Sequence, residues 1–297
     1  MPWYPDLFSA PVLERIRSQA ADARVAQPVP YFDGLRSGEI DALVGSFAGE
    51  PELHHPLRGR VKGRRGFEQF VADTDAWLAS RNVVWGEVER IITPERGIEE
   101  VVLTVDLDGG RIDVPVAVVA DRRDDGRILE LRIYFGNWPL TGRHANRLPV
   151  LPADPDLARP DVVGDHQRAM AAGDVEGAVA TFEVDGYVRE PAGGRYMHRG
   201  RDELVALYEL FFSGGGIDQK QCAIADDHRA CALEYNIVRW GPTELLPPEA
   251  GLAVYVRGGT GKLASVRIYD DVDPPLALEA RRRGDPVELG GNDELKP

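Results

Sequence analysis

The sequence repeats itself at a fixed offset of 135 residues. Without a gap, LRSGEIDALVGSFAGEPELHHP, residues 35–56, aligns with MAAGDVEGAVATFEVDGYVREP, residues 170–191. The same offset places GRILELRIYFGNWP, residues 126–139, on GKLASVRIYDDVDP, residues 261–274. This period is far longer than that of solenoid repeats, so we expect each copy to fold around its own core. Any site should then occur twice, and the two sites can diverge.

The duplication predicts two domains of ordinary size within the 297 residues. We expect the first domain over residues 30–145 and the second over residues 162–276. A proline-rich linker, residues 146–161, separates them. The remaining segments are an N-terminal helical extension, residues 1–29, with an amphipathic helix over 12–26, and a charged C-terminal tail, residues 277–297.

Charge limits the partners that we expect. The 35 basic and 49 acidic residues give a net charge of -14, which repels nucleic-acid backbones and anionic lipid surfaces. The first 20 residues contain no long apolar run, so we expect neither a signal peptide nor a membrane span, and a cytoplasmic location. The two cysteines, Cys222 and Cys231, fit buried thiols better than a disulfide, although their predicted strands are adjacent.

Each copy shows the same order of predicted elements. Two helices meet at a glycine turn, Gly38 or Gly173, and a short strand, a long helix and four more strands follow. The long helices are predicted over residues 64–79 and 201–212. The late strands are predicted over residues 83–92, 99–107, 111–120 and 127–135, and over 219–225, 229–240, 251–256 and 262–270. This order predicts an α+β fold with helices on one face of a curved sheet.

The motifs within these elements resemble a known family. The glycine turn with its following acid, the x-x-P strand end, the G-R or H-R-G turn and the final R-x-Y strand are similar to the SnoaL-like and ketosteroid-isomerase branch of the nuclear transport factor 2 superfamily. The resemblance implies two cone-shaped α+β barrels in tandem, each a curved antiparallel sheet wrapped round helices. It also implies an intrachain pseudo-dimer and leaves further homo-oligomerisation open.

The resemblance also implies candidate catalytic residues. The acid before the strand-ending proline corresponds to His55 in the first copy and Glu190 in the second. A hydrogen-bond donor on the first helix corresponds to Tyr31 and His166. A base opposite such a donor suits enolisation, cyclisation or epoxide opening. The alternatives are that His55 or Glu190 caps a turn or faces solvent, and that Tyr31 belongs to a core.

The last strand of each copy adds further candidates. Ile133 and Phe135 in the first copy, and Ile268 and Asp270 in the second, share one alternating face. If this face lines the cone, Asp270 is an acid in the second pocket where the first has Phe135. Asp271 is the alternative acid. The predicted substrate-binding residues are Phe135, Tyr255, Ile133, Ile268 and Trp85.

These features predict a cofactor-free acid-base enzyme that acts on a hydrophobic small molecule in secondary metabolism. The predicted classes are isomerase and cyclase, including epoxide-opening cyclisation, as in polyketide and polyether pathways, and the second copy is favoured as the active one. No metal site, cofactor motif or nucleophile elbow is present in the sequence. The alternative is a non-catalytic small-molecule-binding or scaffold protein of the same fold. An enzyme should place at least two titratable groups on one enclosed cavity, whereas the cavity of a binding protein can be wholly apolar.

Overall fold

A computed structural model describes residues 40–107, 110–157, 161–193 and 196–274. The chain divides into two compact units, residues 1–135 with 225–232, and residues 136–224 with 233–297. The predicted helix over residues 12–26, the Gly38 turn, Tyr31 and the C-terminal tail lie outside the described residues.

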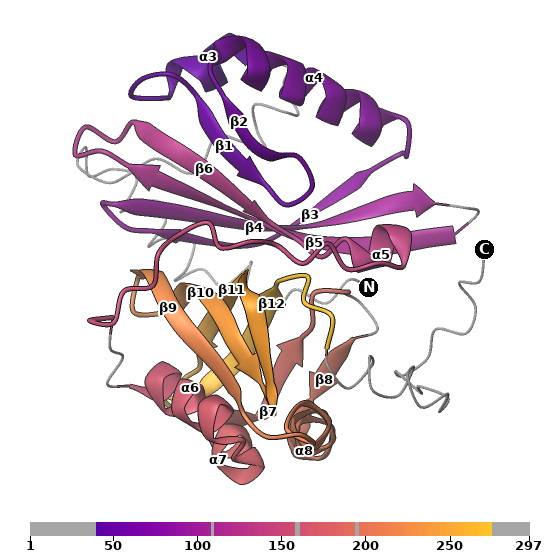
Figure 1. The fold of residues 1–297 in the computed structure, drawn as a ribbon, viewed down its shortest axis with the longest axis vertical. Coiled ribbons are helices and arrows are strands. Elements are labelled where there is room, and N and C mark those ends of the chain that lie inside the picture. The colour runs from indigo at the N-terminus through magenta and orange to yellow at the C-terminus, as the bar shows by residue number, and fades with distance from the viewer. Residues whose placement is uncertain (1–39, 108–109, 158–160, 194–195, 275–297) are drawn as a thin grey trace. The chain divides into compact units, whose positions relative to one another are not determined.

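The first unit contains one six-stranded sheet with helices on one face (Figure 1). Its strands run in the order β2-β1-β6-β5-β4-β3. All pairs described in detail are antiparallel except β1 with β6, which is parallel, so the sheet is mixed. The elements are α3 (Ile40–Gly45), β1 (Glu52–His55), β2 (Gly59–Lys62), α4 (Arg64–Ala79), β3 (Val84–Ile92), β4 (Arg96–Leu107), β5 (Gly110–Arg122) and β6 (Ile128–Tyr134).

The second unit repeats this arrangement. Its sheet has the order β8-β7-β12-β11-β10-β9, with β7 and β12 parallel. Helices α6, α7 and α8 lie along one face of this sheet (Figure 1). The elements are α5 (Trp138–Thr141), α6 (Val162–Ala172), α7 (Val175–Ala180), β7 (Phe182–Arg189), β8 (Met197–Arg199), α8 (Gly200–Phe211), β9 (Ile217–Asp226), β10 (Ala230–Trp240), β11 (Thr243–Arg257) and β12 (Leu263–Tyr269).

Equivalent elements keep the offset of the sequence repeat. Both α7 and β12 begin and end 135 residues after α3 and β6. The two sheets also have the same strand order. The α+β fold class with two sheets in tandem, expected from the sequence, is therefore confirmed. One detail differs from the expected antiparallel sheets: each sheet contains a parallel pair and is therefore mixed.

Each unit buries the apolar stripe that its short helix predicts. Leu43 and Phe47 are buried in the first unit, and the ring of Phe47 packs edge-on against Phe67 of α4, with ring centroids 5.3 Å apart. Ala178 and Phe182 are the buried equivalents in the second unit. This packing holds the helices against one face of each sheet. In the second unit, this face carries the cavity described next.

Candidate functional site

The second unit contains a cavity of about 150 Å³ between its helices and the inner face of its sheet. A cavity of roughly this volume holds one benzene molecule in other proteins. The lining side chains are mostly apolar or aromatic, and they include Met170, Val188, Phe211, Ile217, Ile237, Trp240, Ala253, Tyr255, Val266 and Ile268. The predicted substrate-binding residues Tyr255 and Ile268 are in this set.

Helix α6 carries His166 to the cavity. The carboxylate of Asp161 caps the helix by accepting from the backbone N–H groups of Val163, at 3.0 Å, and Gly164, at 3.4 Å. Gly173 ends the helix with a φ of 70°, as expected for the glycine turn. A Cβ at this position would also lie 2.9 Å from the backbone nitrogen of Gly216, so the close approach of the two turns requires glycine.

His166 lies among aromatic rings in the interior. Only 2% of its surface is exposed, and the rings of Phe182, Tyr208 and Tyr255 contact it edge-on. Burial lowers the pKa of His166 to about 3, because the charged imidazolium loses its hydration. The imidazole is therefore neutral near pH 7.

The hydrogen bonding of His166 indicates its tautomer. Nε2 lies 2.7 Å from the hydroxyl of Tyr208, and Nδ1 is buried without a partner among the described residues. If Nε2 carried the proton, both the Tyr208 hydrogen and the Nδ1 lone pair would be unsatisfied. If Tyr208 donates to Nε2, only one group, Nδ1–H, lacks a partner. The second arrangement leaves fewer unsatisfied groups and presents a donor for a ligand oxygen.

Strand β12 brings a carboxylate to the same cavity. Val266, Ile268 and Asp270 all line it, so the apolar face of this strand is the cavity face. The hydroxyl of Tyr235 donates to Oδ2 of Asp270 at 2.9 Å. Burial raises the pKa of Asp270 to about 6; the negative charge of Asp271 acts in the same direction, and the Tyr235 hydrogen bond opposes both.

Gly251 makes room for the Tyr235 side chain. A Cβ at position 251 would lie 2.5 Å from the ring of Tyr235 and 2.8 Å from its hydroxyl oxygen. Because only glycine leaves this space free, the backbone of β11 helps Tyr235 to reach Asp270.

Asp271 lines the cavity but is engaged by the segment after α5. Its Oδ2 accepts from the backbone of Ala145 at 2.6 Å, and its Oδ1 accepts from the backbone of Trp138 at 3.3 Å. The ring Nδ1 of His144 also lies 3.3 Å from Oδ1. Both carboxylate oxygens are therefore occupied, which leaves Asp270 as the more available acid.

Glu190 follows β7 directly and also lines the cavity. Its backbone forms a tight turn, because its N–H donates to the carbonyl of Tyr196 and its carbonyl accepts from Gly193. Its Oε1 lies 2.7 Å from Nε2 of His198, a residue of β8. About a quarter of the Glu190 side chain is exposed, at 25%. One carboxylate oxygen is thus held by a histidine at the rim of the cavity.

Four predicted residues of the second copy therefore line one cavity: Glu190, His166, Asp270 and Asp271. Several polar neighbours were not predicted: Tyr208, Tyr235, His198 and Glu249. They lie on α8, β10, β8 and β11 and meet the site only through tertiary packing. On β9, Gln219 also lines the cavity.

The predicted residues of the first copy have different surroundings. Nδ1 of His55 accepts from the backbone N–H groups of Leu57, at 3.1 Å, and Arg58, at 3.2 Å, so this ring caps the turn after β1. Phe70 and Phe135 pack against the ring, each with a centroid distance of 5.3 Å. Ile133 is buried on β6, and Trp85 is partly exposed on β3.

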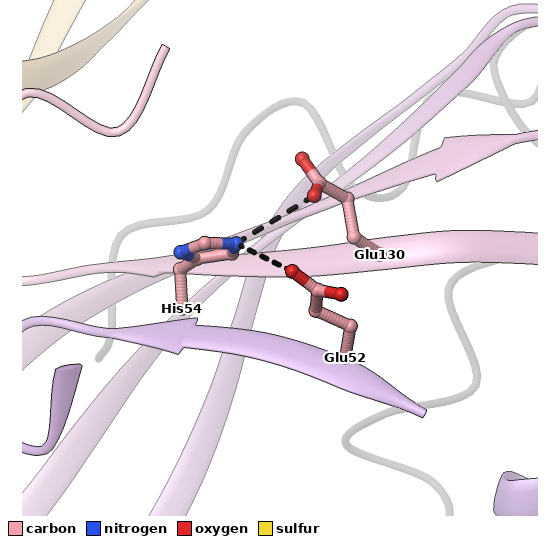
Figure 2. Close-up of side chains that lie close together, drawn as sticks. All are labelled: Glu52, His54 and Glu130. Atoms are coloured by element: carbon pink, nitrogen blue, oxygen red, sulfur yellow. Dashed lines mark ion pairs between the residues drawn. The ribbon is translucent and has the colours of Figure 1, made fainter. Parts of the chain in front are cut away.

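A second polar cluster lies in the first unit. His54 Nε2 is 3.5 Å from Glu52 Oε1 and 3.6 Å from Glu130 Oε2 (Figure 2). Within the described ranges, this is the group whose ligand atoms lie close enough together to hold a metal ion. Basic side chains already neutralise both acids, however: Arg60 and Lys62 pair with Glu52, and Arg132 pairs with Glu130. The local charge therefore does not favour a cation.

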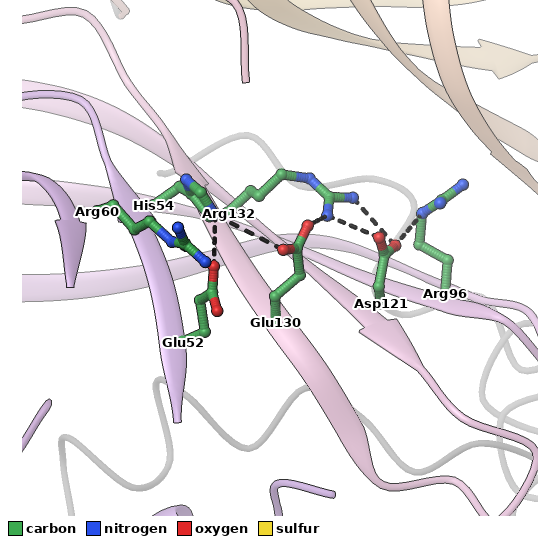
Figure 3. Close-up of polar contacts among 7 residues, drawn as sticks. All are labelled: Glu52, His54, Arg60, Arg96, Asp121, Glu130 and Arg132. Carbon is green, nitrogen blue, oxygen red and sulfur yellow. Dashed lines mark hydrogen bonds and ion pairs between the residues drawn. The ribbon is translucent and has the colours of Figure 1, made fainter. Parts of the chain in front are cut away.

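This cluster belongs to a longer ion-pair network (Figure 3). Arg132 is fully buried and binds Asp121 as well as Glu130, and Arg96 also binds Asp121. The members lie on β2, β1, β6, β5 and β4, which are consecutive strands of the sheet. We interpret the network as a structural feature that links neighbouring strands of the first sheet. We therefore place the candidate functional site in the second unit.

Comparison with solved structures gives matches to NTF2-like proteins and to a candidate polyketide cyclase. An NTF2-like protein of unknown function from Cytophaga hutchinsonii is 14% identical, with a TM-score of 0.31, and the match covers 39% of this chain and 91% of that protein. One from Burkholderia xenovorans is 19% identical, with a TM-score of 0.31, and the match covers 38% and 81%. A candidate polyketide cyclase from Sinorhizobium meliloti is 20% identical, with a TM-score of 0.29, and the match covers 35% and 88%.

These likenesses concern the fold alone. No protein-family model matches the chain, and no curated protein sequence matches it. In the described part of the chain, no helix combines the length and apolar character needed to cross a membrane.

Proposed function

We propose that the second unit binds a small hydrophobic molecule and performs acid-base chemistry on it as an isomerase or cyclase, including epoxide-opening cyclisation in secondary metabolism. The observation that carries this proposal is the cavity of about 150 Å³ that Glu190, His166 and Asp270 line together. A mostly apolar cavity with several titratable groups is typical of an active site.

The proposed chemistry assigns a role to each side chain. For a ketone, Glu190 accepts a proton from the carbon next to the carbonyl, and the electron pair of the broken C–H bond moves toward the carbonyl oxygen. Nδ1–H of His166 donates to that oxygen and stabilises its developing negative charge. Asp270, which is protonated in part near its pKa of about 6, supplies a proton when a second carbon or an epoxide oxygen must receive one.

The S. meliloti neighbour is a candidate polyketide cyclase, which is compatible with this class of chemistry. The alternative, a non-catalytic binding or scaffold protein, is favoured by the mostly apolar and aromatic lining of the cavity. A measurement of proton transfer separates the two.

Cyclohexanone is a suitable probe because its single ring matches the cavity volume. We expect the protein to accelerate exchange of the α-protons of cyclohexanone with D₂O, measured by NMR. Glu190→Gln should slow this exchange about 100-fold or more. Glu209→Gln, an exposed change of the same kind on α8, is the control and should keep the wild-type rate. Circular dichroism checks that both variants fold.

A folded Glu190→Gln variant with the wild-type exchange rate would overturn the assignment of Glu190. If cyclohexanone binds to the wild-type cavity but exchanges no faster than in buffer, and cyclohexene oxide is not opened, the binding-protein alternative is correct.

A further inference from the structure

Every charged lining residue of the cavity other than histidine is acidic. The acids are Glu190, Asp270, Asp271 and Asp273, and no lysine or arginine is among the described lining residues. These carboxylates would repel an anionic ligand, and a neutral ligand would leave their charge uncompensated.

Glu249 adds a fifth carboxylate next to this set. It lies on β11, on the strand side that also carries Gly251, Ala253 and Tyr255. Ala253 and Tyr255 line the cavity. The ring of Tyr235 lies over Gly251, and its hydroxyl group donates to Asp270. Only 8% of Glu249 is exposed. We call Glu249, Asp270, Asp271 and Asp273 the acidic cluster.

The acidic cluster contains acceptors without donors. Oε2 of Glu249 is buried and has no hydrogen-bond partner among the described residues. Oδ1 of Asp273 also lacks a hydrogen bond within this part of the chain, although Nε2 of His144 lies 4.0 Å from it. Elsewhere on the cavity wall, Oε1 of Gln219 is also buried without a partner. Buried acceptors without partners are unfavourable, so these positions call for a ligand that donates hydrogen bonds.

The electrostatics of Glu249 agree with this interpretation. Burial, together with the charges of Asp270, Asp271 and Asp273, raises the pKa of Glu249 to about 7, and His144 acts in the opposite direction. A bound cation would relieve both the desolvation and the repulsion between the carboxylates.

We propose that the ligand of this cavity is a small organic amine whose ammonium group binds the acidic cluster while its apolar part fills the aromatic cavity. An ammonium group has three N–H donors and no acceptor, which matches the unpartnered oxygens. Trp138 and Tyr235, whose backbone N–H and hydroxyl contact Asp271 and Asp270, provide aromatic faces for a cation.

A metal ion fits this cluster less well than an ammonium group. Its ligand atoms are not among those that lie close enough together for metal coordination in the described ranges. A larger cation with several N–H groups can bridge oxygens that are further apart. This inference names the substrate class of the site and so rests on the proposed function.

Cyclohexylamine and cyclohexanol form a matched pair of probes, because they have the same ring and differ in the charged group. At pH 8 and low salt, we expect cyclohexylamine to bind about tenfold tighter or better, measured by calorimetry. Like a lysine side chain, the amine stays protonated at this pH. At pH 5, where Glu249 and Asp270 become protonated, the preference should fall.

Glu249→Gln should reduce the preference for the amine, and Glu249→Gln with Asp270→Asn should abolish it. Glu209→Gln is again the control for a change in net charge.

Equal binding of the two probes to the wild-type protein, or an amine preference that survives the double variant, would overturn the amine inference. In these cases, exchange of cyclohexanone would still support the proposed function. If cyclohexanone neither binds nor exchanges, the proposed function fails as well.

Discussion

At the scale of residues, the buried carboxylate of Glu249 should reduce the stability of the folded state at high pH. This carboxyl group is buried beside three other acids, and one of its oxygens has no hydrogen-bond partner in the described part of the chain. An unfolded chain exposes the same group to water, where its pKa is near 4.5. Folding therefore becomes less favourable as the pH rises from this value through about 7, because the folded state holds the proton more tightly.

This linkage predicts the effect of removing the charge. Glu249→Gln should stabilise the protein at pH 8 by on the order of 1–3 kcal/mol, because a neutral amide replaces an uncompensated buried carboxylate. At pH 4 the effect should be small, since Glu249 is then protonated in the folded state. Urea unfolding at the two pH values measures the difference. A variant that is less stable than the wild type at pH 8 would show that Glu249 has a favourable partner.

The sequence predicts part of the site at this scale. The family resemblance implies Glu190 and His166, and the alternation along the last strand indicates Asp270, with Asp271 as its alternative. Tyr235 and Glu249 could not be found in this way. Their roles depend on contacts between strands, such as the space over Gly251, that no local periodicity encodes.

At the scale of elements, the network on the first sheet is the most distinctive polar feature. It joins side chains of five neighbouring strands, and its centre is the buried guanidinium of Arg132. The hydrogen bond from Arg60 is the main reason that the pKa of Glu52 falls to about 2. A carboxylate with a lowered pKa stabilises the fold above its ordinary value of 4.5, and this contribution is lost as the pH falls toward 2.

We therefore expect Glu52→Gln to weaken the first unit at pH 7 but not at pH 2. The free energy of unfolding of the variant should depend less on pH between these values than that of the wild type. Denaturation at several pH values, followed by the fluorescence of Trp85 in a background without the other tryptophans, reports on this unit. Parallel pH profiles for the variant and the wild type would show that Glu52 contributes no such linkage.

Most elements follow from the sequence, and the exceptions have a physical cause. Helix α4 has the predicted bounds, because its apolar residues keep a strict helical period. Strand β11 begins at Thr243 rather than near Gly251. Pro247 and Pro248 lack backbone N–H groups, so the sequence does not indicate a strand at this point. The first part of β11 is largely exposed and therefore tolerates the two prolines.

At the scale of the whole molecule, the two copies keep one fold but differ at the positions proposed for the site. Glu190 and Asp270 of the second copy correspond to His55 and Phe135 of the first. His55 caps a turn, whereas Glu190 pairs with His198 at the rim of a cavity. We infer that the second unit carries the chemistry and that the first has diverged toward a structural role, with charge pairs across its sheet.

A direct comparison of the two equivalent positions tests this account. The rate of α-proton exchange of cyclohexanone in D₂O should be measured for the wild type, His55→Gln and Glu190→Gln under one set of conditions. We predict that folded His55→Gln keeps the wild-type rate within about threefold, while Glu190→Gln loses about 100-fold. Loss of exchange in His55→Gln, with full activity in Glu190→Gln, would place the chemistry in the first unit and contradict the account.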